Sequence, residues 1–215
     1  MDKDEFTPLC IALREQHFEV AKVLIEADAD VNTGGKEIFG SALHMAVVRA
    51  NLEIVDILIK KYAQVNTIDK DGNTPLHFIM NIFSKSETKY RAIAESLVMS
   101  DAKPNIRNKE MWAPLHIAAR KGMLEAIRWA KMINEILHDL DLEGFDFNAP
   151  GGPQKWTMLH LAGYSGHYKV VEEILSAGTT KYPINLFARN GEMKTARNVS
   201  KGNMSIAKII RKAEN

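Results

Sequence analysis

Thr74-Pro75-Leu76-His77 is the stretch that decides the fold, because it recurs along the chain. Close copies are Ser41-Ala42-Leu43-His44, Ala113-Pro114-Leu115-His116 and Thr157-Met158-Leu159-His160, and more divergent copies are Thr7-Pro8-Leu9-Cys10 and Thr195-Ala196-Arg197-Asn198. They begin at residues 7, 41, 74, 113, 157 and 195, so the steps are 34, 33, 39, 44 and 38 residues. A period of this length indicates a repeat architecture.

An asparagine that follows an apolar residue or proline recurs as a second element. The asparagines of this element are Asn32, Asn66, Asn105, Asn148 and Asn185. Each is followed, 11 to 13 residues later, by the last residue of a tetrapeptide. Since this half of the unit is nearly constant in length, the variation between units falls in the helical half.

Each unit is expected to contain a turn followed by two helices. Asp69 to Asn73 has turn-forming chemistry, and Thr74 then provides an N-cap with Pro75 at the first helical position. An apolar stripe at helical spacing predicts the second helix. The stripe consists of Val20, Val23, Leu24 and Ala27 in the first unit and of Ile54, Ile57 and Leu58 in the second, where Lys61 ends it.

This pattern resembles the ankyrin repeat, a unit of about 33 residues that combines a β-turn with two antiparallel helices. The matching pieces include T-P-L-H at 74–77, L-H-I-A-A at 115–119 with Gly122, and L-H-L-A at 159–162 with Gly166-His167. The resemblance covers essentially the whole chain. It implies an all-α ankyrin-type helical repeat solenoid with β-turn or hairpin tips. The chain departs from the family at Cys10, which replaces a histidine, and at Gln16 and Ala50, which replace glycine.

About six repeats are expected in a single ankyrin repeat domain that spans 1–215. Their approximate bounds are 3–35, 36–68, 69–107, 108–151, 152–188 and 189–215, and the last is expected to act as a C-terminal cap. The third unit carries an insertion at 81–90, and the fourth carries a long second helix from Leu124 to about Leu140.

The composition favours a binding protein over an enzyme. The chain has 215 residues, of which 46% are apolar, and its 28 basic and 27 acidic side chains give a net charge of +1. This balance gives no global attraction for nucleic acid, which is not expected as a partner. Cys10 is the only cysteine, so neither an internal disulfide nor a zinc framework can form. The sequence contains no phosphate-binding, metalloprotease or nucleophile-elbow motif and no apolar run long enough to span a bilayer.

Histidines that recur in one register admit a metal-binding or a structural interpretation. The four are His44, His77, His116 and His160. Stacked repeats lie about 10 Å apart, whereas zinc needs ligands at about 2.1 Å. We therefore expect each neutral ring to hydrogen-bond the backbone and to tie neighbouring repeats together, as the resemblance also implies. The resemblance further implies that repeat asparagines can be substrates of an asparaginyl hydroxylase, and Asn66 and Asn105 are the candidates.

Residues just before the tetrapeptides are expected to project from the hairpins onto a concave surface. They are Phe6, Gly40, Asn73, Trp112, Trp156 and Lys194. Because this position varies from glycine to tryptophan, we interpret Trp112 and Trp156 as interface anchors. The alternative is that each indole packs over its own hairpin. Hairpins and first-helix ends are expected to add Arg49, Arg107, Lys109, Arg120, Lys121 and Tyr164 to the surface.

The function expected from these observations is non-enzymatic protein–protein recognition on the concave hairpin and first-helix face. The partner is a protein of unknown identity, possessing an acidic-aromatic or extended segment, and no cofactor, metal, small-molecule substrate or membrane insertion is expected. One alternative is a structural subunit of a larger assembly, and another is the ankyrin module of a longer channel, transferase or kinase. The expected location is cytoplasmic or nuclear.

Overall fold

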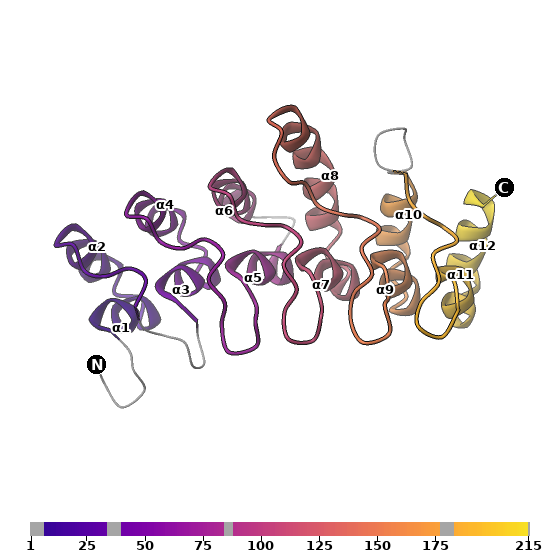
Figure 1. Ribbon diagram of the computed structural model, residues 1–215, viewed down its shortest axis with the longest axis horizontal. Coiled ribbons are helices and arrows are strands. Elements are labelled where there is room, and N and C mark those ends of the chain that lie inside the picture. The colour runs from indigo at the N-terminus through magenta and orange to yellow at the C-terminus, as the bar shows by residue number, and fades with distance from the viewer. Residues whose placement is uncertain (1–6, 34–39, 84–87, 177–182, 215) are drawn as a thin grey trace. The chain divides into compact units, whose positions relative to one another are not determined.

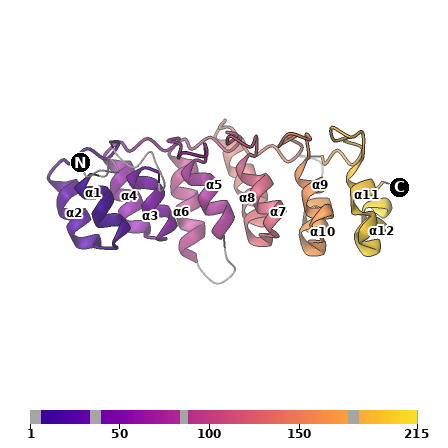
Figure 2. The same ribbon diagram turned by 90° about the horizontal axis from the view of Figure 1, so that it is seen from below.

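The computed structural model describes residues 7–33, 40–83, 88–176 and 183–214. The chain divides into two compact units, Met1–Lys103 (unit 1) and Pro104–Asn215 (unit 2), and each is described by itself. In both units the helices form consecutive antiparallel pairs, and long hairpin-shaped loops join one pair to the next (Figures 1 and 2).

Unit 1 contains three helix pairs in its described part. They are α1 (Pro8–Arg14) with α2 (Phe18–Glu26), α3 (Ala42–Val48) with α4 (Leu52–Lys60), and α5 (Pro75–Ile82) with α6 (Thr88–Met99). The first helices pack in the order α1, α3, α5, and the second helices in the order α2, α4, α6. The predicted insertion at 81–90 covers the end of α5, the start of α6 and the residues that join them, of which 84–87 lie outside the described part.

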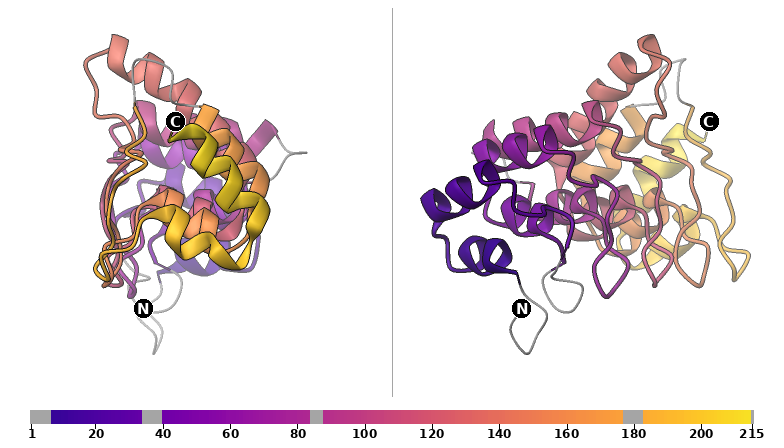
Figure 3. Two further views of the ribbon diagram at one scale, coloured as in Figure 1. Left: turned by 90° about the vertical axis from the view of Figure 1, so that its right-hand side faces the viewer. Right: turned by 60° about the vertical axis from the view of Figure 1, so that its left-hand side comes forward.

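Unit 2 repeats this arrangement with three more pairs. They are α7 (Pro114–Lys121) with α8 (Leu124–Asp139), α9 (Met158–Tyr164) with α10 (Tyr168–Ser176), and α11 (Ala196–Val199) with α12 (Met204–Ala213), the last pair joined by the 3-10 turn η1 (Ser200–Gly202). The first helices α7, α9 and α11 pack in sequence, as do α8, α10 and α12. Two further views show that, in unit 2, the hairpin loops that precede α7, α9 and α11 lie on one side of the helices (Figure 3). The all-α repeat fold expected from the sequence is confirmed.

The first helices begin where the sequence predicts. Thr74 is extended and precedes Pro75, the first residue of α5. In the fifth repeat the Thr157 hydroxyl accepts a hydrogen bond from the backbone N–H of His160 at 3.5 Å. Such caps satisfy backbone donors that the first helical turn leaves unpaired. Ala113 has no side-chain acceptor, yet α7 begins at Pro114 in the same register.

The apolar stripe predicted for α2 is wrong. Val20 and Val23 are 53% and 63% exposed, and the buried residues of α2 are Ala21 and Ile25. The residue in register with Val20 in the next repeat is Ile54, which is fully buried. Ile54 is covered because α2 packs against α4. Within the described residues Val20 has no equivalent neighbour, so the same pattern leaves it exposed.

The two residues that replace glycine adopt the backbone conformation that glycine favours. Gln16 and Ala50 have φ angles of 64° and 51°, and Gly122 and Gly166 have angles of 75° and 79° at the same place in their repeats. A left-handed residue with a Cβ costs about 1–2 kcal/mol relative to glycine. Repeat packing therefore imposes the turn even where the sequence does not favour it.

The long second helix of the fourth repeat is confirmed as α8, which has 16 residues. Its extra length is held by the buried side chain of Asn134, whose amide donates to the Phe145 carbonyl at 2.8 Å and accepts from the Phe145 N–H at 2.7 Å. The Phe145 ring meets Trp129 edge to face, with centroids 5.7 Å apart. The extension is therefore a packed part of unit 2.

Candidate functional site

Hairpins precede the first helices and position the candidate binding residues. In the fifth repeat Gly151 and Trp156 form an antiparallel bridge with two backbone hydrogen bonds of 2.8 Å. In the fourth and sixth repeats the backbone N–H groups of Asn108 and Asn190 donate to the carbonyls of Trp112 and Lys194 at 2.9 and 3.0 Å. Each of these hairpins places the residue before the tetrapeptide beside the first helix of its repeat.

Three of the four recurring histidines tie their repeat to the next hairpin, as predicted, and His77 contacts Thr74 at the start of its own helix. In His44, His116 and His160 the Nδ1 atom accepts from the backbone N–H of the residue three positions earlier, at 3.1, 3.2 and 3.3 Å. Because Nδ1 is an acceptor, the proton of the neutral ring is on Nε2. Nε2 donates at 2.9 Å to the carbonyls of Asn73, Ala149 and Lys194, respectively.

Burial lowers the pKa of these three histidines below the ordinary value, although the hydrogen bonds to the backbone oppose the shift. For His116 the nearby positive charge of Arg107 lowers the pKa further. The rings are therefore neutral at pH 7, with both nitrogens engaged in hydrogen bonds, and they act as structural links.

The recurring asparagines form a second set of links. The Asn66 amide donates to the Asp101 carbonyl at 2.9 Å and accepts from the Lys103 N–H at 2.7 Å. The Asn105 amide donates to the Gly144 carbonyl at 2.9 Å and accepts from the Asp146 N–H at 3.0 Å. Asn32 and Asn148 make equivalent contacts with the following repeats. The sequence indicated a turn role but did not identify these links between repeats.

Trp112 packs on the hairpin of the next repeat as well as on its own repeat. A Cβ placed at Gly152, whose φ is +67°, would lie 2.2 Å from a ring carbon of Trp112. On the other side, the Arg120 guanidinium carbon lies 5.6 Å from the ring centroid. The indole is half-buried between the glycine backbone and a cation. It therefore has a packing role, and a cation–π contact holds Arg120 against it.

Trp156 occupies the equivalent position in the fifth repeat, but a different side chain packs against its ring. Tyr164 follows it by the same eight positions that separate Arg120 from Trp112. The Tyr164 ring stands edge-on to the Trp156 ring, with centroids 5.0 Å apart and an interplanar angle of 83°. Tyr164 is 68% exposed, whereas Trp156 is half-buried. Equivalent positions thus carry a tryptophan under a cation in one repeat and under an aromatic ring in the next.

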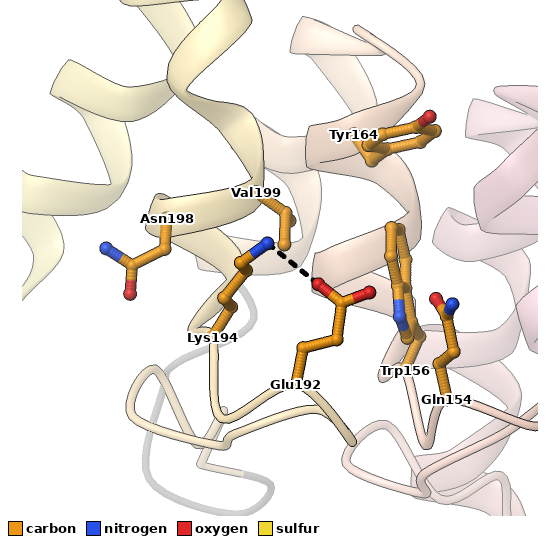
Figure 4. A pocket seen from close by; sticks show the side chains of 7 residues that line it. All are labelled: Gln154, Trp156, Tyr164, Glu192, Lys194, Asn198 and Val199. Atoms are coloured by element: carbon orange, nitrogen blue, oxygen red, sulfur yellow. Dashed lines mark hydrogen bonds and ion pairs between the residues drawn. The ribbon is translucent and has the colours of Figure 1, made fainter.

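A hollow of about 430 Å³ lies between the fifth and sixth repeats, beside this aromatic pair (Figure 4). It is lined by Gln154, Trp156, Tyr164, Glu192, Lys194, Asn198 and Val199. Lys194 donates to Glu192 at 2.7 Å, so the opposite wall from the rings is an ion pair on the sixth hairpin. The indole nitrogen of Trp156 is buried and has no hydrogen-bond acceptor among the described residues.

Four exposed basic residues lie near Trp112. Arg107 and Lys109 are on its hairpin, and Arg120 and Lys121 end α7. Within the described part of the chain none of the four forms an ion pair with a carboxylate. The backbone of Arg120 is fixed, because its carbonyl accepts from His167 Nε2 at 2.9 Å. Unit 2 therefore presents four basic side chains without a carboxylate partner on the Trp112 hairpin and at the end of α7.

Two predicted surface residues belong to unit 1. The Arg49 guanidinium donates to the Arg14 carbonyl at 2.8 Å, which links the second repeat to the first. The Asn73 amide donates to the Asp69 carboxylate at 3.2 Å within its own hairpin. Both residues have structural contacts, and a binding role for either stays a prediction. Phe6 and the start of the chain lie outside the described residues.

The single cysteine and the possible metal ligands are the remaining candidates for chemistry among the described residues. Cys10 is fully buried in α1, and burial raises the pKa of its thiol, which opposes thiolate formation. No group of three His, Cys, Asp or Glu side chains in the described ranges is placed to hold a metal ion. Likewise, none of the described helices combines the length and apolar character that crossing a membrane requires.

Family models match most of the chain. A model described as "Ankyrin repeats (3 copies)" matches residues 81–185, one described as "Ankyrin repeats (many copies)" matches 43–78, and one described as "Ankyrin repeat" matches 4–36. The chain belongs to the ankyrin repeat family. Ankyrin repeats are generally protein-interaction modules and are typically non-catalytic, so the broad functional class expected from the sequence is supported.

The relatives include large proteins of several kinds. Ankyrin repeat protein FPV222 of fowlpox virus (strain NVSL) is 28% identical over 120 residues, which are 56% of this chain and 16% of that protein. The nuclear factor NF-kappa-B p105 subunit of Gallus gallus is 24% identical over 159 residues, 72% of this chain and 15% of that protein. Transient receptor potential cation channel subfamily A member 1 of Drosophila melanogaster is 25% identical over 205 residues, 82% and 17% respectively. The chain thus spans less than a third of each relative.

Proposed function

We propose that unit 2 binds an acidic segment of a partner protein on the surface formed by Trp112, Arg120, Lys121, Arg107 and Lys109, which we call the basic surface. The observation that carries the proposal is the stacking of Arg120 on Trp112, with the guanidinium carbon 5.6 Å from the ring centroid and no carboxylate partner among the described residues.

This arrangement favours an acidic ligand for two reasons. The guanidinium is held against the indole, so less conformational freedom is lost when it binds a carboxylate. Its remaining hydrogen-bond donors can then form a bidentate contact, which is the geometry that arginine provides for carboxylates. Arg107, Lys109 and Lys121 add positive charge that steers an acidic partner and fixes its orientation.

The hydrogen-bonded links between repeats supply the rigidity that the proposal needs. His116 fixes the fourth repeat to the fifth hairpin through the Ala149 carbonyl, and His167 fixes α10 to the end of α7 through the Arg120 carbonyl. A preformed surface limits the ordering cost of binding.

Affinity purification with two charge-reversal variants tests the proposal. The test variant is Arg120→Glu/Lys121→Glu, and the matched control is Lys208→Glu/Lys212→Glu on α12, where both side chains are exposed and the change in net charge is the same. Circular dichroism checks that both variants fold. We expect an acidic partner to be retained by the wild type and the control and lost by the test variant. Equal recovery by all three, or no protein retained by the wild type, contradicts the proposal.

Two further predictions accompany this function. Hydroxylation is proposed at Asn66 and Asn105, each of which uses both ends of its amide in links to the following repeat, so a hydroxylase would act on a locally opened chain. Peptide mass spectrometry of the protein from its natural source tests this proposal, which predicts the gain of one oxygen atom at either residue.

A cytoplasmic or nuclear location is proposed because a chain with a single cysteine is suited to a reducing compartment. Immunofluorescence tests that location.

A further inference from the structure

The hollow beside Trp156 is a second feature of the unit 2 surface that the basic surface does not explain. It lies between the fifth and sixth hairpins, and Tyr164 at the end of α9 lines it together with Trp156. A volume of about 430 Å³ falls within the range of ligand-binding pockets in proteins. It therefore has room for a large side chain of a bound segment.

The walls of the hollow favour an aromatic side chain. Trp156 and Tyr164 meet at 83° with centroids 5.0 Å apart, which leaves ring faces available to a third ring. The opposite wall is the Lys194–Glu192 ion pair, whose charges are matched. Because that pair leaves no net charge on its wall, the aromatic rings decide which side chain is preferred.

The indole nitrogen of Trp156 adds a preference within the aromatic class. This donor is buried, and no acceptor among the described residues satisfies it. A buried donor without an acceptor raises the energy of the empty site. Because Trp156 lines the hollow, a small local shift would let an oxygen atom of a ligand reach the indole nitrogen. A tyrosine hydroxyl provides such an oxygen, whereas phenylalanine does not.

The register of the repeats sets the distance between this hollow and the basic surface. Trp156 is one repeat beyond Trp112, and the hollow extends toward the repeat after that. Adjacent repeats lie about 10 Å apart, so the hollow is about 10–15 Å from Arg120. An extended segment covers this distance in about three to five residues.

We infer that the hollow between the fifth and sixth repeats takes an aromatic side chain, tyrosine in preference to phenylalanine, from the same acidic segment that binds the basic surface. The aromatic residue lies about three to five positions from the acidic residues of that segment. This inference rests on the proposed function and adds the chemistry and spacing of the ligand.

Selection from phage-displayed random dodecapeptides tests the inference on the full chain. We expect selected peptides to combine acidic residues with a tyrosine or other aromatic residue three to five positions away. The best selected peptide should bind the Tyr164→Ala variant about tenfold more weakly than the wild type, since aromatic anchors carry much of the binding energy. Tyr62→Ala is the matched control, because Tyr62 is an exposed tyrosine (87%) of unit 1 and should leave binding unchanged.

The outcomes separate this inference from the proposed function. Acidic peptides without the spaced aromatic residue, or an unchanged affinity for Tyr164→Ala, overturn the inference and leave the proposed function intact. Selected peptides that are not acidic, or no enrichment at all, overturn both. Replacing tyrosine by phenylalanine in the best peptide tests the role of the hydroxyl, and an equal affinity overturns the preference for tyrosine.

Discussion

Replacing His160 by asparagine tests the account of the histidine links in unit 2. The sixth repeat supplies the precedent, because Asn198 occupies the same register and its amide oxygen accepts from the Thr195 N–H at 3.2 Å and from the Thr195 hydroxyl at 2.9 Å. The variant His160→Asn should therefore keep the N-terminal cap of α9. It should lose the 2.9 Å bond to the Lys194 carbonyl, because asparagine is shorter. At pH 7.5 we expect a loss of about 1 kcal/mol.

The effect of acid follows from the lowered pKa of His160. The folded state disfavours the protonated ring, whereas the ring in the unfolded chain protonates near pH 6.5. Between these pKa values the unfolded state binds more protons, so stability falls as pH falls below about 6.5 and is constant above it. At pH 5.5 each such histidine can remove at most about 1.4 kcal/mol. The wild type should lose up to this amount through His160, and the variant should lose none at this position.

Urea unfolding followed by circular dichroism at pH 7.5, 6.5 and 5.5 measures this difference. The variant should be less stable than the wild type at pH 7.5, and the difference in stability should become smaller as the pH falls to 5.5. Ser205→Ala on α12, at an exposed position with no titratable group, provides the control and should leave the pH dependence unchanged. A gap that is independent of pH would show that His160 is not held neutral, and the reasoning would fail.

Three further substitutions test the packing, each by the same urea measurement. Gly152→Ala should destabilise the protein by about 2 kcal/mol or more, because φ at this position is +67° and the new Cβ would collide with Trp112. Part of this loss should be recovered when Trp112→Ala is added. If the effects of the two substitutions on the free energy of unfolding simply add, the contact between the two residues is refuted. Ala50→Gly should stabilise by about 1 kcal/mol because its φ is 51°, and a loss of stability would refute that interpretation. Asn134→Ala should cost about 2–4 kcal/mol through its two bonds to Phe145, and a neutral result would mean that the α8 extension is loosely attached.

The elements that the sequence predicts well depend on local chemistry. A threonine followed by proline at Thr74-Pro75 fixes a helix start with groups that are adjacent in the chain, and it is found where expected. His44, His116 and His160 could be assigned a structural role because zinc coordination needs ligands closer than the repeat spacing allows. Their exact acceptors belong to the following hairpin and come from the structure.

The elements that the sequence predicts poorly depend on which neighbour is present. Val20 fits the apolar pattern of a buried stripe but is 53% exposed, because burial at this register requires a preceding helix. Asn134 looks like a polar residue on a long helix, and its role depends on a contact eleven residues away in the chain. The sequence does carry a signal for the pairing of Trp156 with Tyr164. Tyr164 follows Trp156 by eight positions, and Arg120 follows Trp112 by the same eight positions.

Hydrogen exchange with a bound acidic partner tests the central claim most directly, because it locates the binding surface without any substitution. Peptides from the full chain would be compared by mass spectrometry with and without the partner recovered by affinity purification. The account predicts protection on the hairpin and helix end at 107–122 and around the hollow at 154–165 and 190–199. Protection confined to the α8 extension at 135–146, or to unit 1, would contradict it.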